Sequence, residues 1–466
     1  MKHLKNHIKA AMTFLLVLFI VLTGFFVYSI YTDGTRWYNS SNNTRLQADT
    51  DHVIMGDVTD RNGNLIAWSN APNSRSYTDN NALRYSLAHL LGDDIGMTSA
   101  DLQSRFARIL YGDERGFISK LIETVEQENI HGENIMLTID QNVQMTAYDA
   151  LYGREGAVVV MNYQTGEVIA NVSLPTFDPA SVTYEEALQA PNGTFVNKVT
   201  QGLYPPGSIF KIITAASAIE NDGMYATYTC DGVNQIENTA VRVACFHNNV
   251  HGDLDLTGAF TRSCNGAFAD WGVHICGADS LYSTAEKFGF NDNFLFGDCT
   301  LYNSSFVMPE TDYDLAWASV GQGKTMISPL HAVMIASSVA NEGVMMEPRY
   351  LYAVSDVNGV VQMESSAQYR RTMDSSTANV IEELMANTVL EGTASACHID
   401  GVTVCGKTGT AEVDNEEPHA WFVGYIADES APYAIAIIVE NAGTGAGVAV
   451  PIAREVLVSC LEISNE

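Results

Sequence analysis

The sequence predicts an α/β fold for residues 151–466, preceded by one membrane-spanning helix and a small mixed region. Strand-like apolar runs lie near both ends of this segment, and a long, mostly helical stretch separates them. A run without charged residues lies close to the N-terminus. We therefore divide the chain into a tail at 1–9, a membrane helix at 10–32, a pedestal domain at 33–150 and a larger domain at 151–466.

Composition narrows the classes of function. The 466 residues leave room for two folded regions, and an apolar content of 46% supports a sizeable core. The formal net charge of −31 argues against nucleic acid as a partner, because phosphates would be repelled.

The first segment predicts a membrane anchor. Three lysines precede the uncharged run Ala10–Thr32, which exceeds the roughly 20 residues that a helix needs to cross a bilayer. With these lysines before the run and Asp33 after it, we expect a single-pass protein of the cell membrane. Its N-terminus would lie in the cytoplasm and its larger domain outside. The alternative is a cleaved signal peptide, but the run is long for one and no small-x-small cleavage site follows it.

Residues 33–150 predict a small region with a structural role. Trp37–Thr50 is polar and rich in asparagine, which is typical of a linker. Asp57–Trp68 predicts a β-hairpin, because Asp60-Arg61-Asn62-Gly63 is a turn signal between two short apolar strands. Helical spacing of apolar residues occurs in three runs, Arg84–Leu91, Leu102–Leu110 and Phe117–Glu128.

Residues 151–466 predict strands on both sides of a helical block. Ala157–Met161 and Glu167–Val172 form a predicted hairpin across Tyr163-Gln-Thr-Gly166. The stretch from Ser208 to about Asn341 is largely helical in pattern. Three further predicted strands and a closing helix follow, at Val402–Val413, Ala420–Ala427, Tyr433–Glu440 and Pro451–Leu461.

One stretch carries the candidate chemistry. Tyr204-Pro-Pro-Gly-Ser208 fixes a turn, and the apolar run after it predicts one buried helix that ends at Asn221-Asp222-Gly223. Ser208 and Lys211 are three residues apart and share a helix face near the N-terminus, where negative charge is favoured. Burial would favour the neutral, basic form of Lys211. The alternative is a capping serine and a lysine whose amine reaches the surface.

Two further motifs favour the chemical interpretation. Ser263-Cys264-Asn265 lies between two apolar, helix-like segments, and Lys407-Thr408-Gly409-Thr410 lies inside a strand-like run. Each motif is weak alone. In this chain order, Ser-x-x-Lys, Ser-x-Asn and Lys-Thr-Gly form the motif set of penicillin-binding proteins and serine β-lactamases. The ordered triple at these spacings is a specific signal.

The flanking sequence narrows the resemblance. The chain resembles class B penicillin-binding proteins, the monofunctional D,D-transpeptidases of cell-wall synthesis, and its short N-terminal part is similar to the penicillin-binding protein A group. The resemblance covers nearly the whole chain outside the N-terminus. It is carried by Gly56–Gly63, Leu137–Asp140, Gly156–Val160, Thr165–Val168, Pro206–Lys211, Ser263–Asn265, Gly321–Gly323, Gly406–Thr410 and Trp421–Gly424.

The resemblance implies the fold shared by transpeptidases and serine β-lactamases. An antiparallel sheet is built from both ends of the domain, with a helical insertion between them and a dimerisation-type pedestal before them. The active site then lies between the edge strand and the helical block.

The resemblance also implies acyl transfer through a serine ester. Ser208 would attack the carbonyl of the penultimate D-alanine of a stem peptide, with neutral Lys211 as the base. Ser263 would relay a proton between Lys211, Lys407 and the departing D-alanine. Asn265 would hold the backbone of this donor stem peptide and would contact Lys211. Lys407 would also help to keep Lys211 neutral by repulsion of like charges.

The strand motif would bind the end of the donor. Lys407 would supply positive charge for the terminal carboxylate, and the hydroxyls of Thr408 and Thr410 would bind the same group. Gly409 would keep the strand open to a substrate that lies along it. By resemblance, the backbone N–H groups of Ser208 and Thr410 form the oxyanion hole. A β-lactam would mimic the D-Ala-D-Ala end and leave a slow ester on Ser208.

Three alternatives use the same residues: a β-lactamase, a D,D-carboxypeptidase, and a non-catalytic scaffold or sensor that binds β-lactams. The predicted anchor and pedestal argue against a β-lactamase, and the intact motifs argue against an idle scaffold.

The chain has no acid-rich glycosyltransferase segment. The resemblance therefore implies a partner glycan polymerase of the SEDS family.

All eight cysteines lie in the larger domain. A location outside the cytoplasm permits disulfides, and Cys230–Cys245 and Cys397–Cys405 are the candidate pairs. Neither a Cys-x-x-Cys motif nor a His pair at zinc-site spacing occurs, so we expect no metal and no cofactor. We expect Cys264 to be a small buried apolar side chain. No role is assigned to His247, His251 and His419.

Overall fold

The computed structural model describes residues 2–38, 52–93, 95–98, 101–112, 129–236, 241–356, 359, 361–413 and 416–464. The predicted linker beyond Tyr38 and the predicted helix Phe117–Glu128 lie outside these residues.

Helix α1 (Lys2–Tyr38) contains the predicted membrane run. Its segment Lys5–Ser29 is long and apolar enough to cross a membrane. Large apolar side chains along this segment are exposed, as they are in a helix that meets lipid.

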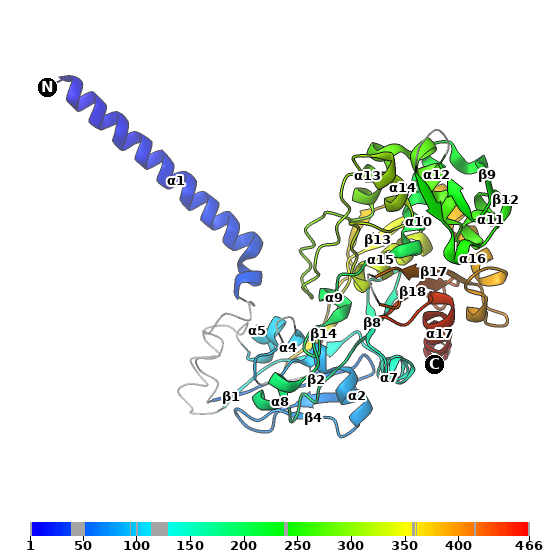
Figure 1. Ribbon diagram of the computed structural model, residues 1–466. Coiled ribbons are helices and arrows are strands. Elements are labelled where there is room, and N and C mark those ends of the chain that lie inside the picture. The colour runs from blue at the N-terminus through cyan, green and yellow to red at the C-terminus, as the bar shows by residue number, and fades with distance from the viewer. Residues whose placement is uncertain are drawn as a thin grey trace.

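A six-stranded sheet combines N-terminal strands with a hairpin from much further along the chain (Figure 1). The predicted hairpin at Asp57–Trp68 is present: β2 and β3 pair antiparallel, and Asp60 accepts hydrogen bonds from the backbone N–H groups of Asn62 and Asn64 in the turn. In spatial order the strands are β15 (Val361–Met363), β14 (Leu351–Ser355), β6 (Asn134–Leu137), β2 (Val58–Thr59), β3 (Leu65–Trp68) and β4 (Ser76–Tyr77).

Short helices cover part of this region. The two predicted helical runs that fall within the described residues are each split in two, at Leu87 and at Phe106. Leu83, Leu91 and Leu110 point into the core. The elements are α2 (Asn81–Ser86), α3 (Ala88–Leu91), α4 (Leu102–Arg105) and α5 (Ala107–Leu110), together with the parallel pair β1 (Val53–Ile54) and β5 (Ile130–His131).

The larger region is built on a five-stranded antiparallel sheet, which confirms the predicted fold. Its order places β17, the strand of the Lys-Thr-Gly motif, at an edge. All five strands coincide with predicted ones. In spatial order they are β17 (Val404–Ala411), β18 (His419–Ile426), β19 (Tyr433–Val439), β7 (Gly156–Asn162) and β8 (Val168–Leu174).

Helices cover both faces of this sheet. Along β7, Ala157 and Val159 belong to the core that contains α15 (Pro329–Ala340). Val158 and Val160 belong to the core of α7 (Gln141–Leu151) and α17 (Val450–Ser464) on the opposite face. Burial on both faces explains why β7 is a continuous apolar run and not an alternating one.

The helical block lies between β8 and β17 in the chain and beside β17 in space (Figure 1). The predicted helix that begins at Ser208 is divided: a 3₁₀ turn, η2 (Gly207–Phe210), carries Ser208, and α10 begins at Lys211. The helices are α8 (Tyr184–Gln189), α9 (Lys198–Gln201), α10 (Lys211–Glu220), α11 (Leu256–Thr261), α12 (Asn265–Trp271), α13 (Gly277–Lys287), α14 (Asp312–Ser319) and α16 (Ser375–Leu390).

Short strands and turns complete the described chain. Two antiparallel strand pairs lie inside the helical block, β9 with β12 and β10 with β11. Strand β12 contacts α11, and β9 and β11 contact α12. The strands are β9 (Thr227–Cys230), β10 (Val233–Gln235), β11 (Arg242–Ala244), β12 (Gly252–Asp255), β13 (Val344–Met346) and β16 (Gln368–Arg371). The 3₁₀ turns are η3 (Gly223–Tyr225), η4 (Phe246–Asn248) and η6 (Ser395–Cys397), and two short π-helical segments are η5 (Gly272–Cys276) and η7 (Gly445–Ala449).

Candidate active site

Ser208 lies on η2, which is pressed against the edge strand. The backbone N–H of Gly207 donates to Gly321 O at 2.9 Å, and Gly207 has a positive φ of 53°. A Cβ at Gly207 would lie 2.6 Å from Thr410 O on β17. Only glycine allows this approach. The contact places Ser208 at the boundary between the helical block and β17, where it lines a cavity of about 650 Å³.

Lys211 is fully buried and is held by three oxygen atoms. Its Nζ donates to Ser263 O at 2.7 Å and to Asn265 Oδ1 at 2.8 Å, and lies 3.2 Å from Ser263 Oγ. Burial lowers the pKa of this amine to about 8, although the thiols of Cys264 and Cys245 oppose the shift. The neutral amine is therefore far more populated near neutral pH than in a free lysine.

Ser263 and Asn265 occupy the turn between α11 and α12. Ser263 adopts a left-handed backbone conformation with a φ of 56°, which is uncommon for a residue with a side chain. Asn265 donates from Nδ2 to Ala244 O at 2.9 Å, so its Oδ1 is left to accept from Lys211. Cys264 caps α12, because its sulfur accepts from the N–H of Ala267.

Lys407 completes the network from β17. Its Nζ is fully buried and donates to Ser263 Oγ at 2.9 Å and to Thr408 O at 3.0 Å. Burial, followed by the charge of Lys211, lowers the pKa of Lys407 well below its usual value. Ser263 Oγ thus bridges two buried amines. Lys407 Nζ lies 5.5 Å from the centroid of the Phe260 ring, and Lys211 Nζ lies 5.4 Å from the centroid of the Phe268 ring. Each ring offers the charged form of its amine partial compensation for burial.

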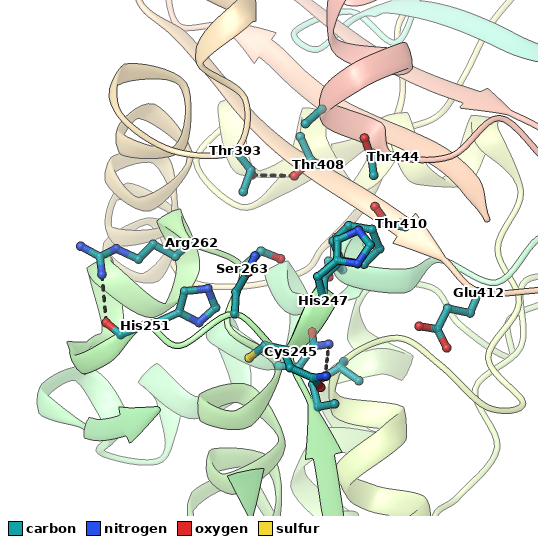
Figure 2. Close-up of a pocket in the computed structure, with 18 of the residues that line it drawn as sticks. Cys245, His247, His251, Arg262, Ser263, Thr393, Thr408, Thr410, Glu412 and Thr444 are labelled. Atoms are coloured by element: carbon teal, nitrogen blue, oxygen red, sulfur yellow. Dashed lines mark hydrogen bonds between the residues drawn. The ribbon is translucent and has the colours of Figure 1, made fainter. Parts of the chain in front are cut away.

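The strand motif forms the opposite wall of the cavity. Figure 2 shows Thr408 and Thr410 on β17 facing the side that carries Ser263, and Thr408 Oγ1 lies 2.6 Å from Thr393 Oγ1. Gly409 has a packing role: a Cβ there would lie 2.8 Å from Trp421 Cβ and 3.0 Å from Ile209 Cγ2. Glycine therefore lets β17 pack closely on η2.

The structure brings the predicted residues together. Lys211, Ser263, Asn265 and Lys407 form one hydrogen-bonded network, and Ser208, Thr408 and Thr410 line the same cavity. Several other lining residues carry no predicted role. Trp317 lies on α14, and Gln322 lies in Gly321–Gly323, one of the stretches that carry the resemblance. The others come from segments without a recognisable pattern: Thr393, Glu412 and Thr444, together with His247 and His251.

All eight cysteines are buried, and none of them forms a disulfide. The predicted pair Cys230–Cys245 is close, with 3.7 Å between the sulfur atoms, but it is not bonded. Cys397 and Cys405 are not bonded to each other either.

Comparisons with known proteins agree with this geometry. The penicillin-binding protein transpeptidase domain matches residues 156–458. Peptidoglycan D,D-transpeptidase PbpA from Mycolicibacterium smegmatis is 27% identical, over 97% of this chain and 98% of its own. PbpA from Mycobacterium tuberculosis is 29% identical, over 96% of each chain.

Solved structures give the same assignment. Penicillin-binding protein A from M. tuberculosis in a penicillin G acyl-enzyme complex superposes with a TM-score of 0.78 and 28% identity, over 88% of this chain and 99% of that chain. The imipenem acyl-enzyme complex of the same protein gives a TM-score of 0.80, also with 28% identity, over 89% of this chain and 100% of that chain. Since the family match spans well over half of the sequence, this chain belongs to the penicillin-binding protein transpeptidase family.

Proposed function

We propose that this protein is a peptidoglycan D,D-transpeptidase that cross-links stem peptides through an acyl-enzyme on Ser208. One observation carries the proposal: Lys211, Ser263 and Lys407 form a buried hydrogen-bonded network at the cavity that Ser208 lines. A serine hydroxyl needs a nearby base to act as a nucleophile, and a buried amine with a lowered pKa is a suitable one.

In the first half-reaction, Ser208 Oγ bonds to the carbonyl carbon of the penultimate D-alanine, and Lys211 accepts the hydroxyl proton. The peptide bond to the terminal D-alanine then breaks. Ser263 passes a proton to the departing amine from the Lys211–Lys407 pair. An amine of a second stem peptide next attacks the ester, and the new amide forms as Ser208 regains its proton.

Lys407, Thr408 and Thr410 are the proposed ligands of the donor's terminal carboxylate. The proposed oxyanion hole consists of the backbone N–H groups of Ser208 and Thr410. The close approach of Gly207 to Thr410 O supports this assignment, because it brings these two segments together. Loss of one such donor typically slows acyl transfer by about two to three orders of magnitude.

Helix α1 is the proposed single-pass anchor, with the N-terminus in the cytoplasm and residues 33–466 outside. The proposed domains are the pedestal at 33–150 and the transpeptidase domain at 151–466. The partner glycan polymerase of the SEDS family would contact α1 and the pedestal. In-membrane crosslinking from α1 should recover a multi-spanning polymerase; recovery of none would contradict this part of the proposal.

The first experiment is labelling of the full chain, purified in detergent, with a fluorescent penicillin. We expect a stable covalent label that Ser208→Ala abolishes. Ser217→Ala, which changes a buried serine on α10, should keep the label and is the matched control. A label that decays within minutes would identify a β-lactamase, and no label on a folded chain would leave a scaffold.

A second assay separates the transpeptidase from the carboxypeptidase. A donor that ends in D-Ala-D-Ala is offered with and without an acceptor amine. Formation of the cross-linked amide supports the proposal. Release of D-alanine without any cross-linked product would identify a D,D-carboxypeptidase.

A further inference from the structure

Four side chains with metal-binding atoms meet directly behind the Ser263 turn. Cys230 ends β9, Cys245 follows β11, His251 precedes β12, and Cys264 lies between Ser263 and Asn265. The three sulfur atoms and one imidazole nitrogen all lie within 4.8 Å of one another. Each of the three cysteines is at most 3% exposed.

Three of the six distances between these atoms are close to those around a single tetrahedral ion, and the others do not exceed 4.8 Å. Cys245 Sγ lies 3.7 Å from both Cys230 Sγ and Cys264 Sγ, and Cys230 Sγ lies 3.4 Å from His251 Nδ1. Around tetrahedral zinc, with Zn–S near 2.3 Å and Zn–N near 2.0 Å, ligand atoms are separated by about 3.5–3.8 Å. A disulfide needs sulfur atoms about 2.05 Å apart and would use only two of the four groups.

We propose that this protein binds one structural zinc ion through Cys230, Cys245, His251 and Cys264. Thiolate and imidazole are ligands that suit zinc, whereas magnesium and calcium prefer oxygen. Four protein ligands fill the tetrahedron, so the site is closed and holds no position for a reacting water. On binding, the cysteine ligands lose their protons to solvent.

Groups around the cluster suit bound thiolates. The backbone N–H of Ala267 donates to Cys264 Sγ at 3.5 Å, and the N–H groups of Asn265 and Gly266 donate to the sulfur of Cys245. Arg262 Nη1 donates to His251 O at 3.0 Å and holds the histidine's segment in place (Figure 2). Such hydrogen bonds orient metal ligands and disperse their negative charge.

The position of the cluster gives the ion a positioning role in the proposed reaction. Cys264 separates Ser263 from Asn265, which both contact Lys211. Cys245 follows Ala244, whose carbonyl accepts from Asn265 Nδ2. An ion at this point would therefore fix the Ser263–Asn265 turn to β9 and β11. Without it, the turn depends on the cap of α12 and on the contacts with the two lysines.

The sequence led us to expect no metal, because no two of its ligands have the local spacing of a zinc motif. The four ligands come from four separate segments, and only the fold brings them together. This differs from zinc sites whose ligands occur as closely spaced pairs.

The first test is metal analysis of the full chain, purified in detergent without chelator. We expect about one zinc per chain by elemental mass spectrometry, and three sulfur neighbours and one nitrogen neighbour by X-ray absorption at the zinc edge. His251→Ala should lower the zinc content. Cys397→Ser, which changes a buried free cysteine outside the cluster, should retain it. A different resident ion, no ion, or a Cys230–Cys245 disulfide found by mass spectrometry would overturn the proposal.

The positioning role, which rests on the proposed function, is tested by penicillin acylation. A misplaced catalytic group can cost as much as 100-fold in rate, so we expect chelated protein and His251→Ala to acylate about 10- to 100-fold more slowly. Zinc should restore the rate of the chelated wild type but not that of the variant. An unchanged rate in zinc-free protein would overturn the positioning role. Absence of acylation in zinc-loaded protein would count against the proposed function only.

Discussion

At the scale of single residues, the amine of Lys211 is the group whose ionisation should control the reaction. Burial lowers its pKa to about 8, and it must be neutral to accept a proton from Ser208. The rate of penicillin acylation should therefore rise as pH increases through about 8. Stopped-flow acylation of the full chain, with stability checked at each pH, measures this. A rate that falls over that interval would exclude Lys211 as the base.

Gly409 is a second residue with a specific physical requirement. A Cβ there would press on Trp421 and Ile209, between β17 and the turn that carries Ser208. Gly409→Ala should destabilise the protein by about 1–3 kcal/mol, the usual cost of overpacking, and slow acylation. Gly297→Ala is the control, because a Cβ at Gly297 meets no atom within 4 Å. Thermal unfolding and penicillin labelling of both variants test this prediction. Equal stability and equal labelling rates in the two variants would contradict the packing role of Gly409.

At the scale of elements, α15 carries a buried histidine that should make the fold sensitive to acid. His331 is fully buried, with Nδ1 at 2.7 Å from Ser304 Oγ and Nε2 at 2.8 Å from Phe288 O. Burial lowers its pKa from 6.5 to about 4. The unfolded chain therefore binds more protons between these values. The stability that His331 contributes is present above pH 6.5 and is lost as pH falls towards 4.

Between pH 7 and pH 5 this loss should amount to about 2 kcal/mol. Denaturant unfolding at the two pH values measures it, and His331→Gln should show a smaller dependence on pH than the wild type. His89 is also buried, with its pKa lowered to about 4, and adds a loss of the same sign to both proteins. The difference in pH dependence between the wild type and His331→Gln therefore reports on His331 alone. Identical pH dependence in the two proteins would contradict the prediction.

The elements also show how far the sequence predicts the structure. Strands β7, β8, β18 and β19 were predicted because each is a mostly apolar run. Strand β17 was predicted because the Lys-Thr-Gly motif lies in a strand-like run from Val402 to Val413. The 3₁₀ turn at the start of the Ser208 helix was not predicted, because the 3₁₀ form of η2 depends on its contact with β17. The pairing of β14 with β6 was not predicted either, since it joins segments more than 200 residues apart.

The site was predictable where short motifs carry it. The three motifs identified Ser208, Lys211, Ser263, Asn265 and Lys407. By contrast, Thr393 reaches the site through a hydrogen bond from the loop after α16, and Thr444 lines the cavity from the segment before η7. The Cys–His cluster depends on the same kind of long-range convergence. Local patterns report on neighbours along the chain, whereas these groups become neighbours only in the fold.

At the scale of the whole molecule, the two large sheets are joined through Glu167. This residue precedes β8 of the five-stranded sheet, and its carboxylate pairs with Arg61 at 3.2 Å and also with Arg349. Arg61 lies in the turn between β2 and β3, and Arg349 precedes β14, so both belong to the six-stranded sheet region. Backbone bonds between Val168 N and Arg349 O and between Arg349 N and Gly166 O, each of 2.9 Å, reinforce the junction.

Glu167→Gln should weaken this junction more than its small change in size suggests. Glu167 is 7% exposed, and the change leaves two largely buried guanidinium groups without their anion, which typically costs about 3–5 kcal/mol. Glu220→Gln is the control: it breaks the exposed pair with Lys287, where a loss of under about 1 kcal/mol is expected.

Because the junction is far from the Ser263 network in sequence and in the fold, penicillin acylation of the folded Glu167→Gln variant should stay near the wild-type rate. Calorimetry should then show a lower first transition for Glu167→Gln, as the six-stranded region detaches before the penicillin-binding sheet unfolds. A single transition at the wild-type temperature would mean that the backbone bonds alone hold the two regions together.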